Sequence, residues 1–126
     1  IELGLGYLKL GQMSMNLSGG EAQLIKLAKA LGVSSGGHNL YILDEPTSGL
    51  NDVDINRFEN ILFSLQANKE TIIIVEHNIE FISRISDYII DFGIVGGNAG
   101  GKIVAQGLPE HVFKCKESSL YNLDIL

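Results

Sequence analysis

Apolar residues in this chain recur at two spacings, one that favours helices and one that favours strands. Between residues 20 and 31 they lie three and four positions apart, which predicts a helix, and residues 32–37 indicate a flexible loop. A second helix is predicted to begin with Asp52 as its capping residue and to end near Asn68. Its apolar residues would form a face that lies on a sheet: Ile55, Phe58, Ile61, Leu62 and Leu65.

Short apolar runs predict the strands of that sheet. Residues 40–43 form a run closed by Pro46, which is typical of a strand buried on both faces, and the β-branched residues 71–75 give the clearest strand. Residues 79–85 then predict a short helix, 87–92 a strand, 102–106 a strand after a glycine-rich turn, and 109–114 a helix. The alternation predicts an α/β fold with a three-layer, mainly parallel sheet.

The composition narrows the class of protein. At 126 residues, 45% of them hydrophobic, the chain has the size and apolar content of one globular domain. Its net charge is -6 and its nine Lys and Arg residues are scattered, so the segment itself offers no basic patch for nucleic-acid phosphates. The single cysteine, Cys115, excludes an internal disulfide and fits a reducing, cytoplasmic setting. No apolar run approaches the roughly 20 residues that span a bilayer.

The sequence LSGGEAQ at residues 17–23 places a serine and two glycines at the start of the first predicted helix. Ser18 and Glu21 match a capping box, a pair that can serve only to start a helix. Glycine in a first helical turn costs up to about 1 kcal/mol against alanine, so Gly19 and Gly20 indicate that a ligand approaches the backbone closely. Bare amides at a helix N-terminus attract anions, and a phosphate is the obvious candidate.

Two carboxylates, Asp44 and Glu45, end the strand predicted at residues 40–43. Because consecutive side chains of a strand point to opposite faces, one can hold Mg²⁺ through water while the other faces a nucleophilic water. A solvated turn is the alternative interpretation of this pair.

His77 follows the strand predicted at residues 71–75. It can donate a hydrogen bond to a terminal phosphate or orient the attacking water, although a lone histidine in this position is more often structural. Ligands of open α/β sheets bind at the carboxyl ends of the strands, and Asp44, Glu45 and His77 are all expected at that edge.

Together these residues resemble the motifs of ABC-type ATPases. LSGGEAQ resembles their signature motif, YILDEP the Walker B strand, SGLND the D-loop and EH the switch histidine. More narrowly, the GEAQ form, the preceding GLGYLKLGQ, and the later IIDFG and GGNAGGKIVAQG are similar to the carboxyl-terminal ATPase domain of the UvrA family of excinuclease components. The resemblance covers about residues 4 to 113.

This resemblance implies a P-loop NTPase fold of the ABC type that is incomplete on its N-terminal side, with residues 1–126 forming part of one domain. It also implies that Asp44 holds Mg²⁺, Glu45 polarises the attacking water and His77 senses the γ-phosphate of ATP. Five signature residues would close over ATP held by another ATPase domain, so that one chain contributes to two composite sites: Ser18, Gly19, Gly20, Glu21 and Gln23. The D-loop residues Ser48, Gly49 and Asn51 would link these ATP sites across the interface.

For the full-length protein, the resemblance implies an ATP-hydrolysing DNA-damage sensor that forms a homodimer and works with DNA and the B subunit of the excinuclease. The 126 residues contain no phosphate-binding loop of the form GxxxxGK[ST], and the resemblance places that loop upstream together with a zinc-binding insertion. One cysteine and three histidines predict no zinc centre here. The chain begins with Ile1 and not Met, which suggests a fragment. Because the phosphate-binding loop is missing from it, we expect that the fragment does not hydrolyse ATP alone.

Two departures from the family pattern keep other interpretations open. Leu24 replaces a basic residue, and Ile94 and Val95 replace a proline-containing pair, which suggests a divergent member or a paralogue. A paralogue that removes DNA-intercalating drugs is one alternative, because fold and motifs do not reveal the ligand. The others are an ATPase subunit of a membrane transporter and a non-catalytic interaction module that keeps remnants of the motifs.

Overall fold

The computed structural model describes residues 37–93 and 100–121, which divide between two compact units. The first described unit comprises residues 37–78, and the second begins at residue 79. The helix predicted at residues 20–31 lies outside the described residues. So do the signature residues and the two departures from the family pattern: Ser18, Gly19, Gly20, Glu21, Gln23, Leu24, Ile94 and Val95.

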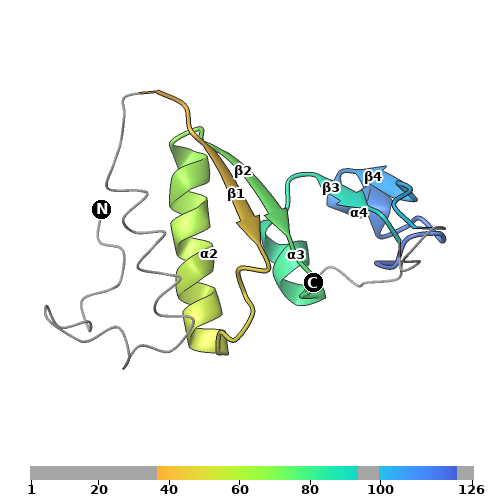
Figure 1. The fold of residues 1–126 in the computed structure, drawn as a ribbon, viewed down its shortest axis with the longest axis horizontal. Coiled ribbons are helices and arrows are strands. Elements are labelled where there is room, and N and C mark those ends of the chain that lie inside the picture. Colours follow the sequence, from red (N-terminus) through yellow and green to blue (C-terminus); the bar gives the residue numbers. More distant parts are fainter. Residues whose placement is uncertain (1–36, 94–99, 122–126) are drawn as a thin grey trace, which may run out of the picture. The chain divides into compact units, whose positions relative to one another are not determined.

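The first unit is a β-α-β arrangement of β1 (Leu40–Asp44), α2 (Asp52–Ala67) and β2 (Thr71–Val75). The two strands pair in parallel, with Leu40 opposite Thr71 and Asp44 opposite Val75. Helix α2 returns the chain from the end of β1 to the start of β2, and it contacts β2 (Figure 1). The positions predicted for all three elements are therefore confirmed.

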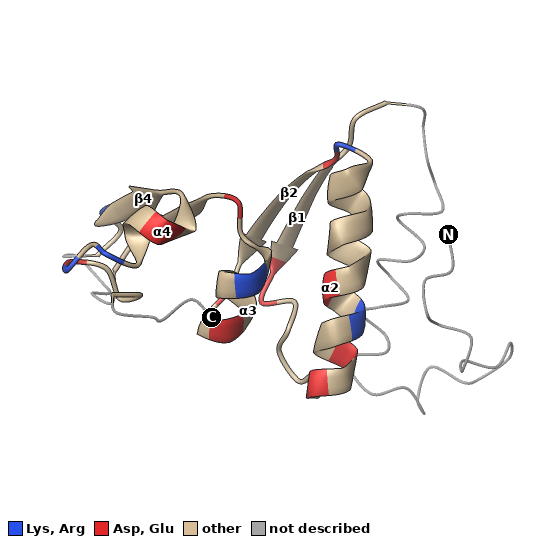
Figure 2. Cartoon of the chain, turned by 180° about the vertical axis from the view of Figure 1, so that it is seen from behind, with Lys and Arg blue, Asp and Glu red and all other residues tan. Residues whose placement is uncertain are grey.

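Asn51, and not Asp52 as predicted, is the N-terminal cap of α2. The backbone of Asn51 is extended, with φ -85° and ψ 167°, and its side chain accepts a hydrogen bond of 3.0 Å from the Asp54 amide. The Asp54 carboxylate accepts one of 2.8 Å in return from the Asn51 side chain. Asp52 is already helical, and its charge lies in the first turn, where the helix dipole favours it. Figure 2 shows that the charged residues of α2 lie in its N-terminal half.

Five apolar side chains of α2 are buried as their spacing predicts. Ile55, Phe58, Ile61, Leu62 and Leu65 are all at most 8% exposed. Burial of a side chain of this size stabilises a fold by about 1.5–3 kcal/mol, so this face supplies much of the driving force for the unit. The helix ends at Ala67 with Asn68 as its C-terminal cap, close to the predicted end, and Lys69 follows in a left-handed conformation with φ 61°. None of the described helices has the length and apolar content needed to cross a bilayer.

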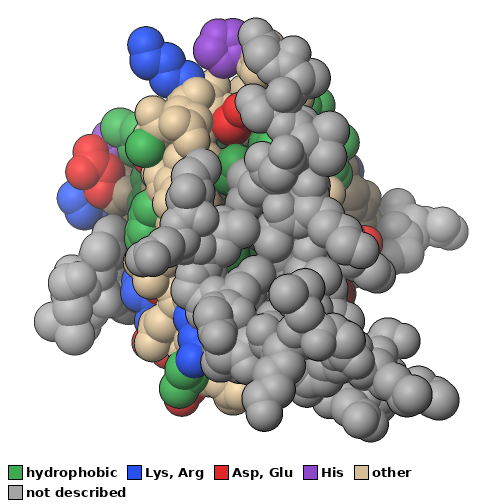
Figure 3. All heavy atoms as spheres, turned by 90° about the vertical axis from the view of Figure 1, so that its left-hand side faces the viewer, with side chains coloured by type: hydrophobic (Ala, Val, Ile, Leu, Met, Phe, Trp, Pro, Cys, Tyr) green, Lys and Arg blue, Asp and Glu red, His purple; other side chains and the backbone are tan. Residues whose placement is uncertain are grey.

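The prediction that β1 is buried on both faces is wrong for this structure. Leu40 and Ile42 are 57% and 68% exposed, and their neighbours Ile73 and Val75 on β2 are about half exposed. The intervening side chains of both strands are half-buried. Helix α2 packs against this strand pair, and one helix layer covers one face of a sheet. Apolar side chains also reach the surface between polar ones on the side of the molecule seen in Figure 3.

The second unit contains α3 (Ile79–Ile85), β3 (Ile89–Asp91), β4 (Ala105–Gly107) and α4 (Pro109–Val112). Strands β3 and β4 are antiparallel, with Ile89 opposite Gly107. Both are short, and β4 begins three residues later than the predicted strand because pairing is limited by the three residues of β3. A cluster of buried apolar residues holds the unit together: Ile89, Val112, Phe113 and Leu120, with Ile82 and Ala105 packed against them.

Asp91 fixes the last described segment to the end of β3. Its carboxylate accepts hydrogen bonds from the Ser118 hydroxyl at 2.6 Å, the Ser119 amide at 2.9 Å and the Gly93 amide at 2.7 Å. Burial alone would raise the pKa of Asp91, but these donors favour the charged form and hold the pKa below its ordinary value. The charged carboxylate is therefore the form that the fold requires.

We expect Asp91→Ala to loosen residues 118–121 without disturbing the first unit. The Ser118 hydroxyl and the Ser119 amide would lose their acceptor, at a local cost of about 1–3 kcal/mol. Hydrogen exchange measured by mass spectrometry on the full-length protein should show faster exchange at residues 118–121 and unchanged exchange in α2. Equal protection of residues 118–121 in both proteins would contradict the importance of this carboxylate.

Candidate functional site

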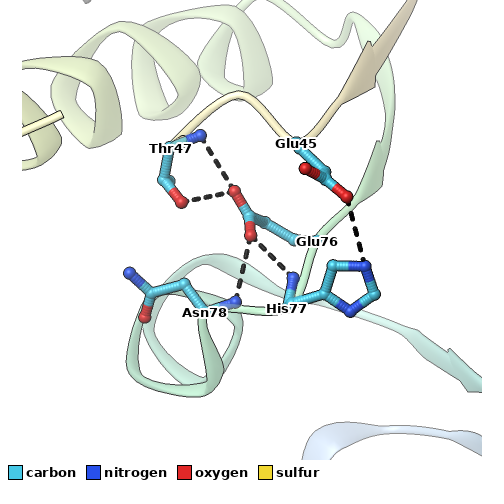
Figure 4. A network of polar contacts seen from close by, with 5 residues as sticks. All are labelled: Glu45, Thr47, Glu76, His77 and Asn78. Carbon is cyan, nitrogen blue, oxygen red and sulfur yellow. Dashed lines mark hydrogen bonds and ion pairs between the residues drawn. The ribbon is translucent and has the colours of Figure 1, made fainter. Parts of the chain in front are cut away.

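The carboxyl ends of β1 and β2 bring Asp44, Glu45 and His77 into one region, as the sequence predicts. Asp44 is the last residue of β1 and pairs with Val75, the last residue of β2. The Glu45 amide donates a hydrogen bond of 2.8 Å to the Val75 carbonyl, which continues the pairing by one step. His77 follows two residues after Val75, and its imidazole faces the side chain of Glu45 (Figure 4).

Glu45 leaves the strand in a left-handed conformation, with φ 44°. This conformation is uncommon for a residue with a side chain, and it usually marks a turn or a functional constraint. The Glu45 carbonyl accepts a hydrogen bond of 3.1 Å from the Ser48 amide, which closes the turn. Strand alternation was predicted to separate the two carboxylates, but the direction of Glu45 is set by this turn, because Glu45 lies just beyond β1.

The imidazole of His77 and the carboxylate of Glu45 face each other. His77 Nε2 lies 3.4 Å from Glu45 Oε1, and the two side chains are 80% and 56% exposed. An exposed pair at this distance contributes little to stability, since water and dissolved ions screen it. Both groups are accessible to water and to a ligand, which suits proton transfer and hydrogen bonding to a substrate better than a structural role.

A fourth residue, Glu76, was missed by the sequence analysis as part of the site. Its Oε1 accepts a hydrogen bond of 2.9 Å from the Thr47 amide and another from the Thr47 hydroxyl. Its Oε2 accepts hydrogen bonds of 2.7 Å and 3.0 Å from the amides of His77 and Asn78 (Figure 4). The sequence carries one signal for this role, a carboxylate directly after an apolar strand. The contacts to Thr47 could not be predicted, because Thr47 lies 29 residues away in the sequence.

These contacts keep the Glu76 carboxylate ionised. Partial burial would raise the pKa of Glu76, but the hydrogen bonds from Thr47, Asn78 and His77 outweigh it and lower the pKa below its ordinary value. A carboxylate that accepts several hydrogen bonds uses most of its lone pairs for them. Glu76 is thus a structural acceptor in this site, in contrast to the exposed Glu45.

The three D-loop residues lie in the segment that joins β1 to α2. Ser48 is exposed, and Gly49 has φ 75° with open space where a Cβ would lie. A glycine suits that position because its backbone is left-handed, and no neighbouring atom competes for the space. Asn51 caps the N-terminus of α2, and its side chain is fixed by a hydrogen bond to the Asp54 carboxylate.

Asp44 fits a cation that retains most of its own ligands. In residues 37–93 and 100–121, no group of three or more His, Cys, Asp or Glu side chains gathers in a way that could hold a metal ion. A single exposed carboxylate suits Mg²⁺, which commonly keeps several waters and takes the rest of its ligands from substrate phosphates. It does not suit a closed zinc site.

Nearly the whole chain is similar to one segment of much longer proteins. It is 51% identical over 117 residues to UvrABC system protein A of Rickettsia bellii, and 52% identical over 118 residues to the proteins of that name from Borreliella burgdorferi and Clostridium perfringens. These matches cover 93–94% of the chain and 12% of each relative. No family model matches the chain.

A solved structure agrees with these sequence matches. The crystal structure of UvrA2 from Deinococcus radiodurans matches with a TM-score of 0.78 and 44% sequence identity. The match covers 93% of this chain and 14% of that one. The chain thus spans about an eighth of the length of the proteins that it resembles, and it is an α/β segment of the UvrA type.

We expect the contribution of Glu76 to this site to disappear on acidification. Because the folded-state pKa lies below the ordinary value, the contribution is complete above the ordinary Glu pKa of about 4.3 and is lost as the pH falls through the folded-state value. The measurement compares hydrogen exchange at residues 47, 77 and 78 between the unaltered protein and Glu76→Gln at matched pH. The difference should be large at pH 7 and vanish in acid, and a difference that grows on acidification would contradict the assignment.

Proposed function

We propose that this chain, a UvrA-type segment, belongs to an ATP-hydrolysing protein that recognises DNA damage in nucleotide excision repair. The observation that carries the proposal is the meeting of Glu45 and His77, 3.4 Å apart, at the carboxyl ends of a parallel strand pair. Sites at this edge are typical of nucleotide-binding α/β folds. The chain spans about 12% of its relatives, so activity, substrates and partners are proposed for the full-length protein.

Each residue of the site has a proposed task that its surroundings support. Asp44 is exposed, forms the last β1–β2 residue pair with Val75, and would hold Mg²⁺ through water. Glu45 is accessible to water and would accept a proton from the attacking water molecule. His77 would hydrogen-bond the terminal phosphate and keep Glu45 oriented through Nε2. Magnesium-bound ATP supplies the phosphoryl group and its neutralising cation when bound.

The remaining roles follow from the family resemblance. The signature residues Ser18, Gly19, Gly20, Glu21 and Gln23, with Ser48, Gly49 and Asn51, would complete an ATP site held by another ATPase domain. The full-length protein would form a homodimer, bind DNA and the excinuclease B subunit, and carry its zinc site and phosphate loop upstream of this segment. Its ATPase domain would be the complete three-layer, mainly parallel sheet, in the cytoplasm.

A UvrA-like paralogue is a second candidate within the same class. The similarity to a protein called UvrA2, at 44% identity, supports it, and so do Leu24, Ile94 and Val95. The relatives compared above, at 51–52% identity, are called UvrABC system protein A, which favours repair over transport. Measuring whether the full-length protein binds damaged DNA or an intercalating drug separates the two UvrA-type candidates.

In the full-length protein, we expect Glu45→Gln to retain nucleotide binding and to lose turnover. The amide keeps the size of the side chain but cannot accept the proton, so steady-state ATP hydrolysis should fall roughly 100-fold or more. Glu110→Gln, on the exposed surface of α4, is the matched control and should hydrolyse ATP normally. An unchanged rate in Glu45→Gln would exclude Glu45 as the base.

For residues 1–126 alone, we expect a dissociation constant for ATP weaker than about 1 mM, equivalent to less than about 4 kcal/mol of binding free energy. The chain has no GxxxxGK[ST] loop, whose backbone amides and lysine hold the phosphates in nucleotide-binding proteins of this type. Isothermal titration calorimetry with Mg²⁺ and ATP provides the measurement. Micromolar binding by this segment would show that its own residues hold the nucleotide.

A further inference from the structure

We propose that Glu76 is a positioning residue that joins the turn after β1 to the chain after β2 and thereby keeps Glu45 and His77 facing each other. This inference rests on the proposed function, because the reaction that it serves is ATP hydrolysis. It assigns a task to a residue that would not itself touch the nucleotide.

The two oxygens of Glu76 divide between the two strand ends. Oε1 accepts both hydrogen bonds of Thr47, which follows β1, while Oε2 accepts the amides of His77 and Asn78, which follow β2 (Figure 4). One planar group therefore spans the gap between segments that are 29 residues apart in sequence. Hydrogen bonds to a charged acceptor contribute more than neutral ones, at about 1.5–3 kcal/mol each, so the carboxylate is a substantial polar link between the two strand ends.

Glu45 and His77 depend on this link because their side chains are exposed. Packing does not hold either one, so the position of each side chain follows from its backbone. The left-handed turn at Glu45 is closed by the bonds from Glu45 to Val75 and from Ser48 to Glu45, and Thr47 lies inside that turn. The bond from the His77 amide to Glu76 fixes the other partner. An unfavourable backbone conformation persists only where its surroundings hold it in place.

The geometry requires a carboxylate at this position. Four donors converge on Glu76, and a charged carboxylate is the side chain that offers acceptors alone. A glutamine would turn its NH₂ group toward the donors of one strand end and leave them without an acceptor. An aspartate is shorter by one methylene group and would not reach both ends.

The experiment measures ATP hydrolysis and nucleotide binding in the full-length protein. We expect Glu76→Gln to lower kcat by about 10- to 100-fold, because a displacement of about 1 Å is enough for such a loss, while the nucleotide dissociation constant stays within about 3-fold. Thr47→Val should also lower kcat, because the hydroxyl is lost. Thr47→Ser keeps the hydroxyl, so its kcat should stay close to that of the unaltered protein. Glu80→Gln is the control: the same change four residues away, on a side chain that is 81% exposed, should leave kcat unaltered.

The outcomes separate this inference from the proposed function. If Glu45→Gln stops turnover while Glu76→Gln leaves kcat unchanged, the positioning role is overturned and the proposed function stands. If Glu76→Gln loses nucleotide binding together with turnover, or if Thr47→Ser fails as badly as Thr47→Val, the role is also overturned.

Hydrogen exchange tests the inference independently of catalysis. If the unaltered protein does not hydrolyse ATP, the proposed function fails by itself. The role of Glu76 is then tested by the hydrogen-exchange rates of the backbone amides of residues 47, 77 and 78. These amides should exchange faster in Glu76→Gln than in Glu80→Gln. Equal exchange in the two variants would overturn the inference.

Discussion

The site depends on the parallel pairing of β1 with β2. Two strands that run in the same direction place their carboxyl ends at one edge, and the register that sets Asp44 opposite Val75 brings Glu45 and His77 to the same height. A shift of one residue would turn every side chain of a strand to the other face. The register is therefore as important to the chemistry as the residues themselves.

A glutamate next to each end of β2 secures this register. Glu70, directly before β2, accepts hydrogen bonds from the backbone amide and the side chain of Asn39, which directly precedes β1. Glu76, directly after β2, does the same for Thr47. The two carboxylates serve the same physical purpose at opposite ends of the pair. They differ in position: Glu70 lies far from the candidate chemistry along the strands, whereas Glu76 is adjacent to His77 in the chain.

The sequence predicted the elements of the first unit well, because periodicity reports on local structure. The five apolar residues of α2 and the β-branched run of β2 each carry their own signal. Asn51 and Asp52 are both good caps, so the pattern could not choose between neighbours. The position of β4 depended on its pairing with β3 across a glycine-rich segment, and the task of Glu76 depended on Thr47. Both are contacts between distant segments, which a single sequence does not display.

The half-exposed face of the strand pair has a consequence for Asp44. Leu40, Ile42 and Asp44 alternate along β1, so the carboxylate ends a row that is otherwise apolar, and Ile73 and Val75 continue that row on β2. Any protein layer laid over these side chains would displace water from around the carboxylate and reduce the local dielectric constant. Coulomb attraction grows as that constant falls, so the same layer would strengthen the attraction between the Asp44 carboxylate and a nearby cation, while it would also raise the cost of removing both charges from water. Hydrophobic cover and the electrostatic environment of this carboxylate are thereby linked through one strand.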